Sequence, residues 1–230
     1  LMIEDRNGNC IWRALSNPSR LASSYFSETA PKSFGLYQRE RDFDHYQDAS
    51  ANYQDRPSLK VEPLGDWGKG MVRLVEIPSD LEINDNIVAF WIPEQDGKAG
   101  DALEFSYRLS WGDLPPAEDG NLAYVVASRA GTGGVSGVEN QADTRKFVVD
   151  FRGGPLTSLP GSESDHIRPV ATIVNGKIEH ETLTPIPEEG VWRFVMDVSA
   201  ESGATVELTA RLEGYEQKLS ETWAYQWSKP

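Results

Sequence analysis

The sequence is poor in the residues that build covalent and metal-bound sites. Cys10 is the only cysteine among 230 residues, so neither an intrachain disulfide nor a cysteine cluster for a metal can form. The three histidines, His45, His166 and His180, are scattered without the spacing of metal ligands. We therefore expect no metal and no cofactor, and any catalysis would have to use other side chains.

Basic residues and long apolar runs are also scarce. The chain has 22 Lys and Arg against 36 Asp and Glu, a formal net charge of -14. Nucleic-acid affinity rests on Lys and Arg, so a nucleic-acid partner is not expected. No apolar run approaches the length of a membrane span, so we expect no spanning helix. An acidic chain with 7 Trp and 8 Tyr suits a neutral polyhydroxylated ligand better than an anionic one.

What the sequence does contain is alternation with a period of two residues. From Leu103 to Trp111, apolar and polar residues alternate as in a half-buried strand, and 86–93 reads as a second strand with turn residues between them. These two segments predict a hairpin. Further strands are expected at 71–78, 145–151, 191–198, 205–214 and 218–227. Only 44–54 could form two or three helical turns, so the fold class is all-β, typical of sandwiches.

Composition divides the chain into two domains. Glycines and small polar residues without an apolar period mark a boundary at 127–144. We predict the second half of a large β-sandwich at 1–130, a linker at 131–143, and a smaller immunoglobulin-like sandwich at 144–230. The chain opens in the manner of a domain interior, so we expect it to be part of something longer.

Three stretches could carry chemistry. The first, Gln38 to Asp48, holds seven ionisable side chains and Tyr46, and such loops are usually solvated turns. The second, 61–70, places Glu62, Asp66 and Trp67 between glycines, where a Trp could shield a carboxylate and raise its pKa. A tight turn with a packed Trp explains the residue pattern of 61–70 equally well. The third and weakest stretch places Trp12 among polar residues.

Several of these stretches together resemble one family. The segments FGLYQRERDFDHYQD, RPSLKVEPLGDWGKG, LVEIPSDLEINDNIVAFWIPE, FSYRLSWGD and ETWAYQW resemble, in order, the periplasmic glucan biosynthesis proteins OpgG and OpgD, also called MdoG and MdoD. Members of that family are about twice as long, with a large β-sandwich followed by a smaller immunoglobulin-like domain. The resemblance makes this chain the second half of the large sandwich plus the C-terminal domain.

The resemblance implies a periplasmic role in making osmoregulated glucans with a β-1,2-linked backbone. The D branch is related to inverting endo-hydrolysis, so the resemblance implies cleavage or transfer of glucan chains. The carry-over assigns Asp66 as general acid, with the base in the missing N-terminal half. It implies a cleft lined by Glu62, Trp67, Tyr46, His45, Arg41, Asp44 and Trp12. The resemblance implies two partners, β-1,2-linked glucan and the membrane glucan synthase. We also expect Arg39 and Arg41 each to meet a carboxylate.

Two other functions remain open from the sequence. The protein could bind a growing glucan without cleaving it, or serve as a scaffold in the glucan synthesis complex. Cleavage and binding both predict an acidic, aromatic cleft, and they differ in their dependence on a carboxylate.

Overall fold

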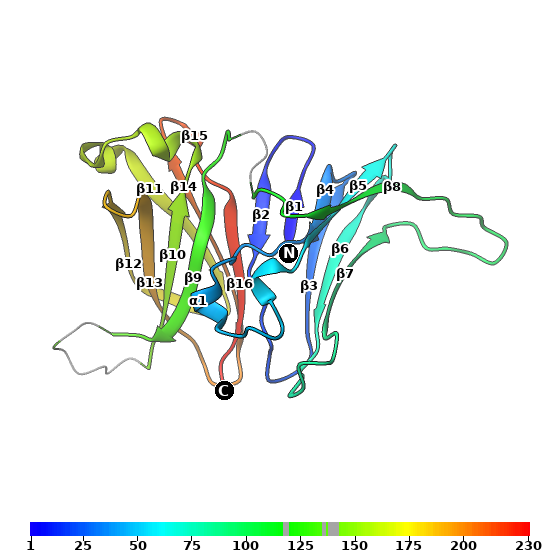
Figure 1. Cartoon of the computed structure of the whole chain (residues 1–230), viewed down its shortest axis with the longest axis horizontal. Coiled ribbons are helices and arrows are strands. Elements are labelled where there is room, and N and C mark those ends of the chain that lie inside the picture. Colours follow the sequence, from blue (N-terminus) through cyan, green and yellow to red (C-terminus); the bar gives the residue numbers. More distant parts are fainter. Residues whose placement is uncertain (117–119, 135–136, 138–142) are drawn as a thin grey trace. The chain divides into compact units, whose positions relative to one another are not determined.

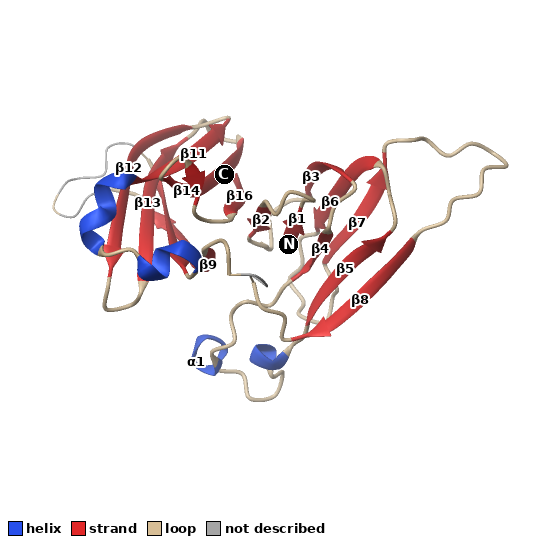
Figure 2. Cartoon of the chain, turned by 90° about the horizontal axis from the view of Figure 1, so that it is seen from above, coloured by secondary structure: helices blue, strands red, loops and turns tan. Residues whose placement is uncertain are grey.

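The computed structural model describes residues 1–116, 120–134, 137 and 143–230, and it confirms the all-β class. The chain forms two compact units. The first comprises residues 1–11 and 15–116, and the second comprises 12–14 and 117–230. Figures 1 and 2 show that each unit is built from two layers of strands.

Within the first unit, the strands of one sheet run in the order β1-β4-β5-β8, and a second, three-stranded sheet has the order β3-β6-β7. The strands of the first sheet are β1 (Met2–Glu4), β4 (Ser33–Leu36), β5 (Ser58–Leu64) and β8 (Ser106–Gly112). Those of the second are β3 (Ala22–Thr29), β6 (Lys69–Glu76) and β7 (Ile87–Pro93).

Alternation in the sequence explains the core of this unit. In β6 every second residue is buried, so Val72 and Leu74 point inward, where they meet Ile3 and Phe34. Strands β4 and β5 approach closely at Gly35, where a Cβ atom would lie 2.0 Å from the Leu59 carbonyl oxygen. Only glycine fits there.

The predicted hairpin of 86–93 with 103–111 is wrong. Strand β7 pairs with β6, and β8 pairs with β5 in the other sheet. The connection from 94 to 105 crosses between sheets and reaches away from both (Figure 1). Local alternation identified the strands, but it carries no information on which strand each one pairs with.

The two or three helical turns that the sequence allowed at 44–54 do not form one continuous helix. The segment contains only the single turn α1 (Phe43–Tyr46) and the 3-10 turn η1 (Tyr53–Asp55). Between them the Asp48 carboxylate accepts hydrogen bonds from the backbone of Ser50 and Ala51, which competes with helical bonding.

The second unit has the strand arrangement of a constant-type immunoglobulin domain. Its strands are β9 (Tyr124–Thr132), β10 (Arg145–Arg152), β11 (Ile167–Val174), β12 (Lys177–Ile186), β13 (Val191–Ser199), β14 (Thr205–Gly214), β15 (Gln217–Lys218) and β16 (Thr222–Ser228). One sheet has the order β12-β13-β10-β9, and the other contains β11-β14-β16. Lettered A to G without the short β15, these read D-E-B-A and C-F-G.

The segment predicted as a linker connects two paired strands. Strand β9 runs to Thr132 and pairs with β10 from Arg145 onward, so both belong to one sheet of the second unit. Residues 135–136 and 138–142 of that segment lie outside the described residues. The division of the sequence at 131–143 stays a prediction about domains, whereas the compact units divide at 116–117.

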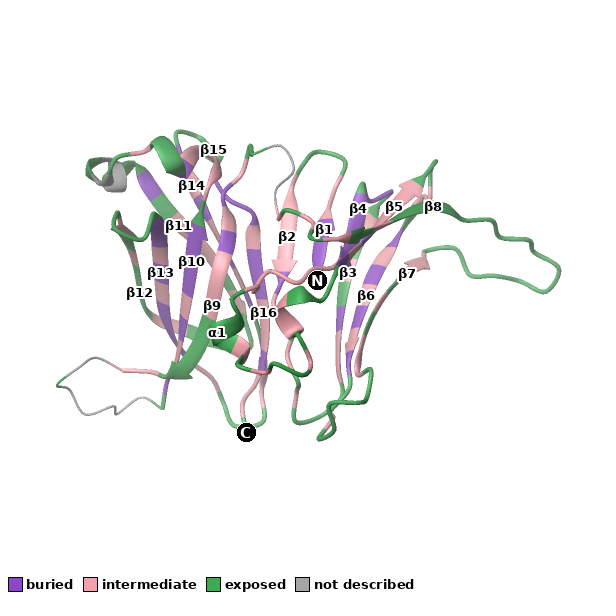
Figure 3. Cartoon of the chain, viewed as in Figure 1, coloured by how far each residue is buried: buried purple, intermediate pink, exposed green. Residues whose placement is uncertain are grey.

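Aromatic residues fill the core between the two sheets of this unit. Phe147 packs edge-on against Trp223 and Trp227, and Trp223 stacks on Tyr225 with ring centroids 5.8 Å apart. Trp12, at the end of β2 (Cys10–Arg13), packs against the same core. Figure 3 shows the buried positions running along the central strands.

The buried carboxylate of Asp150 bonds to side chains of two neighbouring strands in one sheet of this unit. Asp150 on β10 is held by Arg193 of β13 through two parallel bonds of 2.7 and 2.9 Å, and by Arg129 of β9 at 3.0 Å. Burial acts to raise the pKa of Asp150, but the bonds from Arg193 and Arg129 outweigh it and lower that pKa below its usual range. The network links three neighbouring strands.

Candidate functional site

Asp66 lies in the tight turn that joins β5 to β6. Gly65 and Gly68, at φ +95° and +71°, give the turn its shape, which other residues adopt rarely. The Gly68 backbone N–H donates to Asp66 Oδ1 at 2.9 Å, and Arg6 Nη2 lies 3.5 Å from the same oxygen. The Asp66 side chain is 73% exposed. The carboxylate is thus fixed in position and open to water.

Trp67 packs into an aromatic cluster. Its ring centroid lies 5.3 Å from that of Phe105 and 6.1 Å from those of Tyr107 and Trp91, and its Nε1 donates to the Ser106 carbonyl oxygen at 3.1 Å. These contacts place the indole against the core of the first unit. The sequence predicted that Trp67 shields Asp66 from water, and the exposure of Asp66 shows that it does not.

Glu62 is engaged on β5. Lys60 Nζ lies 3.4 Å from Glu62 Oε1, and the Ser110 hydroxyl donates to Glu62 Oε2 at 3.4 Å. Lys60 is buried, and a buried ammonium needs a charged partner. Glu62 therefore compensates the Lys60 charge within the sheet.

The charged segment, Gln38–Asp48, is organised by its own carboxylates. Glu40 Oε1 accepts from the Asp42 backbone N–H at 2.9 Å, while Glu40 Oε2 lies 2.6 Å from His45 Nδ1. Burial acts to raise the pKa of Glu40, but the bonds from Asp42 and His45 outweigh it and lower that pKa. Asp42 in turn caps α1 by accepting from the Asp44 backbone N–H at 2.9 Å. The Asp44 side chain is exposed.

Tyr46 closes the charged segment on itself. Gln38 Nε2 donates to the Tyr46 hydroxyl at 2.5 Å, and that hydroxyl donates to the Glu40 carbonyl oxygen at 3.2 Å. The ring lies 5.7 Å from that of Tyr53. Burial raises the pKa of Tyr46. The hydroxyl is therefore held inside the segment.

Arg41 ties the charged segment to the rest of the first unit. Its Nε lies 2.7 Å from Asp113 Oδ1, and its Nη1 donates to the carbonyl oxygens of Gln54 and Arg56 at 3.0 and 3.1 Å. The prediction that Arg41 meets a carboxylate is confirmed. Arg39 Nη2 lies 3.9 Å from Met2 Sδ, and its meeting with a carboxylate stays a prediction.

The structure brings the predicted site residues together in groups. Asp66 and Trp67 share one turn, while Arg41, Asp44, His45 and Tyr46 share the charged segment. Trp12 belongs to the other unit, where it packs against the core. Sequence reasoning missed the partners Arg6 and Asp113, because they lie 60 and 72 positions from the residues they contact and no local pattern marks such pairs.

Two classes of feature are absent from the part of the chain that the structure describes. No group of three or more His, Cys, Asp or Glu side chains is placed to hold a metal ion. No helix there is long and apolar enough to cross a membrane.

Comparison with known proteins identifies the family. The family described as "Periplasmic glucan biosynthesis protein, MdoG" matches residues 1–227. The chain belongs to the MdoG family. That membership confirms the resemblance seen in the sequence and places the protein in the periplasm.

Relatives of both named branches are similar to this MdoG-family chain. Glucans biosynthesis protein G of Cereibacter sphaeroides is 57% identical over 229 residues, covering 100% of this chain and 42% of that protein. Glucans biosynthesis protein D of Xylella fastidiosa is 43% identical, covering 97% and 42%. Glucans biosynthesis protein D 1 of Ralstonia nicotianae is 44% identical, covering 97% and 41%. The chain thus spans about two fifths of the length of these relatives.

Proposed function

We propose that this MdoG-family chain contributes the general acid, Asp66, to cleavage of a β-1,2-linked glucan. The observation that carries the proposal is the Asp66 turn: a carboxylate fixed by Gly68, open to an incoming ligand, and next in sequence to an aromatic cluster around Trp67. The β-1,2 linkage rests on the resemblance to the family.

The arrangement suits a sugar ligand. The exposed rings near Trp67, Phe105 and Tyr107, offer apolar faces for the C–H faces of a pyranose ring. A glycosidic oxygen above this surface would come within reach of the Asp66 carboxyl group. Proton transfer to that oxygen makes the departing sugar a better leaving group.

A general acid must keep its proton near neutral pH, and exclusion of water is one way to achieve this. Asp66 is open in this chain, so we infer that the bound glucan and the remaining part of the whole-length protein supply the cover. The carboxylate that activates water would come from that remaining part.

A second candidate function is glucan binding without cleavage, with the protein as a binding or scaffold member of the synthesis complex. The ion pair of Asp66 with Arg6 favours this second function, because a carboxylate paired with Arg6 would also suit a turn whose role is only structural. The membrane glucan synthase is the partner proposed for this role.

The two functions can be separated with the whole-length protein. Asp66→Asn keeps the size of the side chain but removes the acid, and it should lower the release of reducing ends from linear β-1,2-glucan by about 10²–10⁴-fold while binding is retained. Asp85→Asn, in an exposed loop of the same unit, is the matched control. A loss below about tenfold removes Asp66 from the role. Wild-type protein that binds glucan but never shortens it favours the second function.

A further inference from the structure

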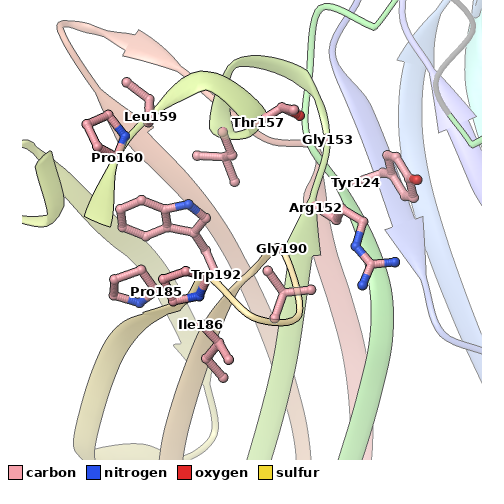
Figure 4. A pocket seen from close by; sticks show the side chains of 13 residues that line it. Tyr124, Arg152, Gly153, Thr157, Leu159, Pro160, Pro185, Ile186, Gly190 and Trp192 are labelled. Atoms are coloured by element: carbon pink, nitrogen blue, oxygen red, sulfur yellow. The ribbon is translucent and has the colours of Figure 1, made fainter. Parts of the chain in front are cut away.

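The second unit contains a pocket that the proposed cleavage does not use. It has a volume of about 530 Å³ and lies at one end of the sandwich, where β9, β13 and the segment after β10 meet (Figure 4). We call it the end pocket. A volume of this size is within the range of small-molecule sites in proteins. All of its lining residues belong to the second unit.

The walls of the end pocket are held rigidly. Pro160, Pro185 and Pro187 line it, and each has a fixed φ angle. Arg152 Nη2 donates to the Glu189 carbonyl oxygen at 2.8 Å, which joins the end of β10 to the turn between β12 and β13. A pocket that is already formed costs little conformational entropy when a ligand enters.

One wall depends on a glycine. Gly153 has φ +84°, and a Cβ there would lie 2.8 Å from Cε1 of Tyr124. The absence of a side chain lets the Tyr124 ring lie close to the backbone at the end of β10. Glycine at position 153 thus allows the Tyr124 ring to form this wall of the pocket.

The lining combines apolar surface with a few polar groups. Trp192, Ile186 and Leu156 provide the apolar part, while Tyr124 and Thr157 carry hydroxyl groups and Arg152 a guanidinium group. Figure 4 shows the Trp192 indole between Leu159, Pro160 and Pro185. A sugar ring needs apolar contact for its C–H faces together with hydrogen-bond donors and acceptors for its hydroxyl groups, and this lining offers both.

We propose that the end pocket binds a glucosyl unit of a neutral glucan. The choice of glucan rests on the proposed function, but the site lies in the other unit from Asp66 and needs no bond cleavage. Its role would be to hold the chain of a long glucan while another part of the protein acts on it. Two sites on one polymer raise the overall affinity through their effective concentration.

The test uses a local signal of the pocket. In the full 230-residue chain, the indole N–H resonance of Trp192 is followed during titration with linear β-1,2-glucan. Thr157 is exposed, so Thr157→Trp should fill the pocket without removing a core residue, and it should weaken the response at least about tenfold. Thr182→Trp adds the same bulk on exposed β12 and should respond as wild type does. Thermal unfolding confirms that both variants are folded.

The outcomes are distinct from those of the Asp66 experiment. Asp66→Asn should leave the Trp192 response unchanged whether or not Asp66 is the general acid. A Trp192 signal that does not move with glucan, or that moves equally in Thr157→Trp, overturns the inference. If a Pro- and Leu-rich peptide saturates the signal and glucan does not, the pocket docks a protein and the inference is wrong.

Discussion

At the scale of single residues, charges that leave water are matched by specific partners. Asp150 has 5% of its side chain exposed, and Arg193 meets it with two parallel hydrogen bonds. Such a fork fixes orientation as well as charge. Neither residue is marked in the sequence, since they lie 43 positions apart on strands that become neighbours only in the fold. Sequence reasoning therefore could not find this pair.

Arg193→Gln should destabilise the chain. Removing one partner of a buried ion pair costs about 3–5 kcal/mol. Arg129 remains beside Asp150, and the Arg193 side chain is 37% exposed, so we expect about 2 kcal/mol. Urea unfolding at neutral pH measures it. Arg168→Gln, which breaks an exposed pair with Glu213, is the control and should cost less than about 1 kcal/mol. Equal losses in both variants would contradict the assignment.

Asp150 should also make stability depend on pH. Its pKa is lower in the folded chain than the usual 3.8, so its contribution is complete above about pH 5 and is lost as the pH falls through the lowered pKa. Asp150→Asn should therefore be less stable than wild type at neutral pH, and the gap should shrink on acidification. Unfolding free energies measured from neutral to acidic pH check this. A gap that stays constant would rule out the charge as its cause.

Trp192→Ala should be among the most costly changes in the second unit. Trp192 is 4% exposed and belongs to the core cluster, and truncation of a buried Trp costs about 3–5 kcal/mol. Trp111 is 63% exposed, so Trp111→Ala is a control for loss of the same side chain and should change stability by less than about 1 kcal/mol. Denaturant unfolding followed by circular dichroism compares the two. A Trp192→Ala loss similar to that of the control would remove Trp192 from the core.

At the scale of elements, the sequence predicted which segments are strands better than how they pair. Alternation found β6, β10, β13, β14 and β16, because one face of each strand meets a core. It could not place β8 beside β5, since that pairing joins segments 48 positions apart. It also missed β9, whose glycine-containing end reads as a loop. In the candidate site, the Asp66 turn was found from its glycines, whereas the contacts of Arg6 and Asp113 were not.

Strand β9 should decide whether the second unit folds by itself. Val125 on β9 is fully buried, its N–H donates to Glu221 Oε1 at 2.7 Å, and Ser128 accepts a bond from Trp223 Nε1 at 2.9 Å. The sequence predicted a separate immunoglobulin-like sandwich at 144–230. Because β9 supplies these buried contacts, we expect 120–230 to unfold cooperatively. Fragment 144–230, which lacks β9, should lose that transition. Scanning calorimetry of both fragments tests this, and cooperative unfolding of 144–230 would show that β9 is dispensable.

At the scale of the whole molecule, acidic charge and exposed apolar surface have opposite effects on self-association. The formal charge of -14 keeps copies apart, yet the edge strand β8 exposes Tyr107, Leu109 and Trp111 on one face. The chain spans about two fifths of its relatives' length. We expect the 230-residue chain to self-associate as salt screens its charge.

Sedimentation velocity at low and high salt measures this association. Leu109→Lys with Trp111→Lys should reduce it, because charged side chains on an edge strand disfavour pairing. Leu81→Lys with Ile83→Lys places the same charges on exposed positions away from β8 and serves as the control. If the control pair reduces association equally, net charge rather than the β8 face is responsible.

The close approach of β4 and β5 at Gly35 has a consequence for how this sequence can change over generations. Every amino-acid replacement there introduces at least a Cβ, which would stand 2.0 Å from the Leu59 carbonyl oxygen. The obstacle is backbone, so no neighbouring side chain can move aside to accommodate it. Only synonymous changes of codon 35 should therefore be tolerated. A saturation library selected for folded protein should return glycine alone at this position.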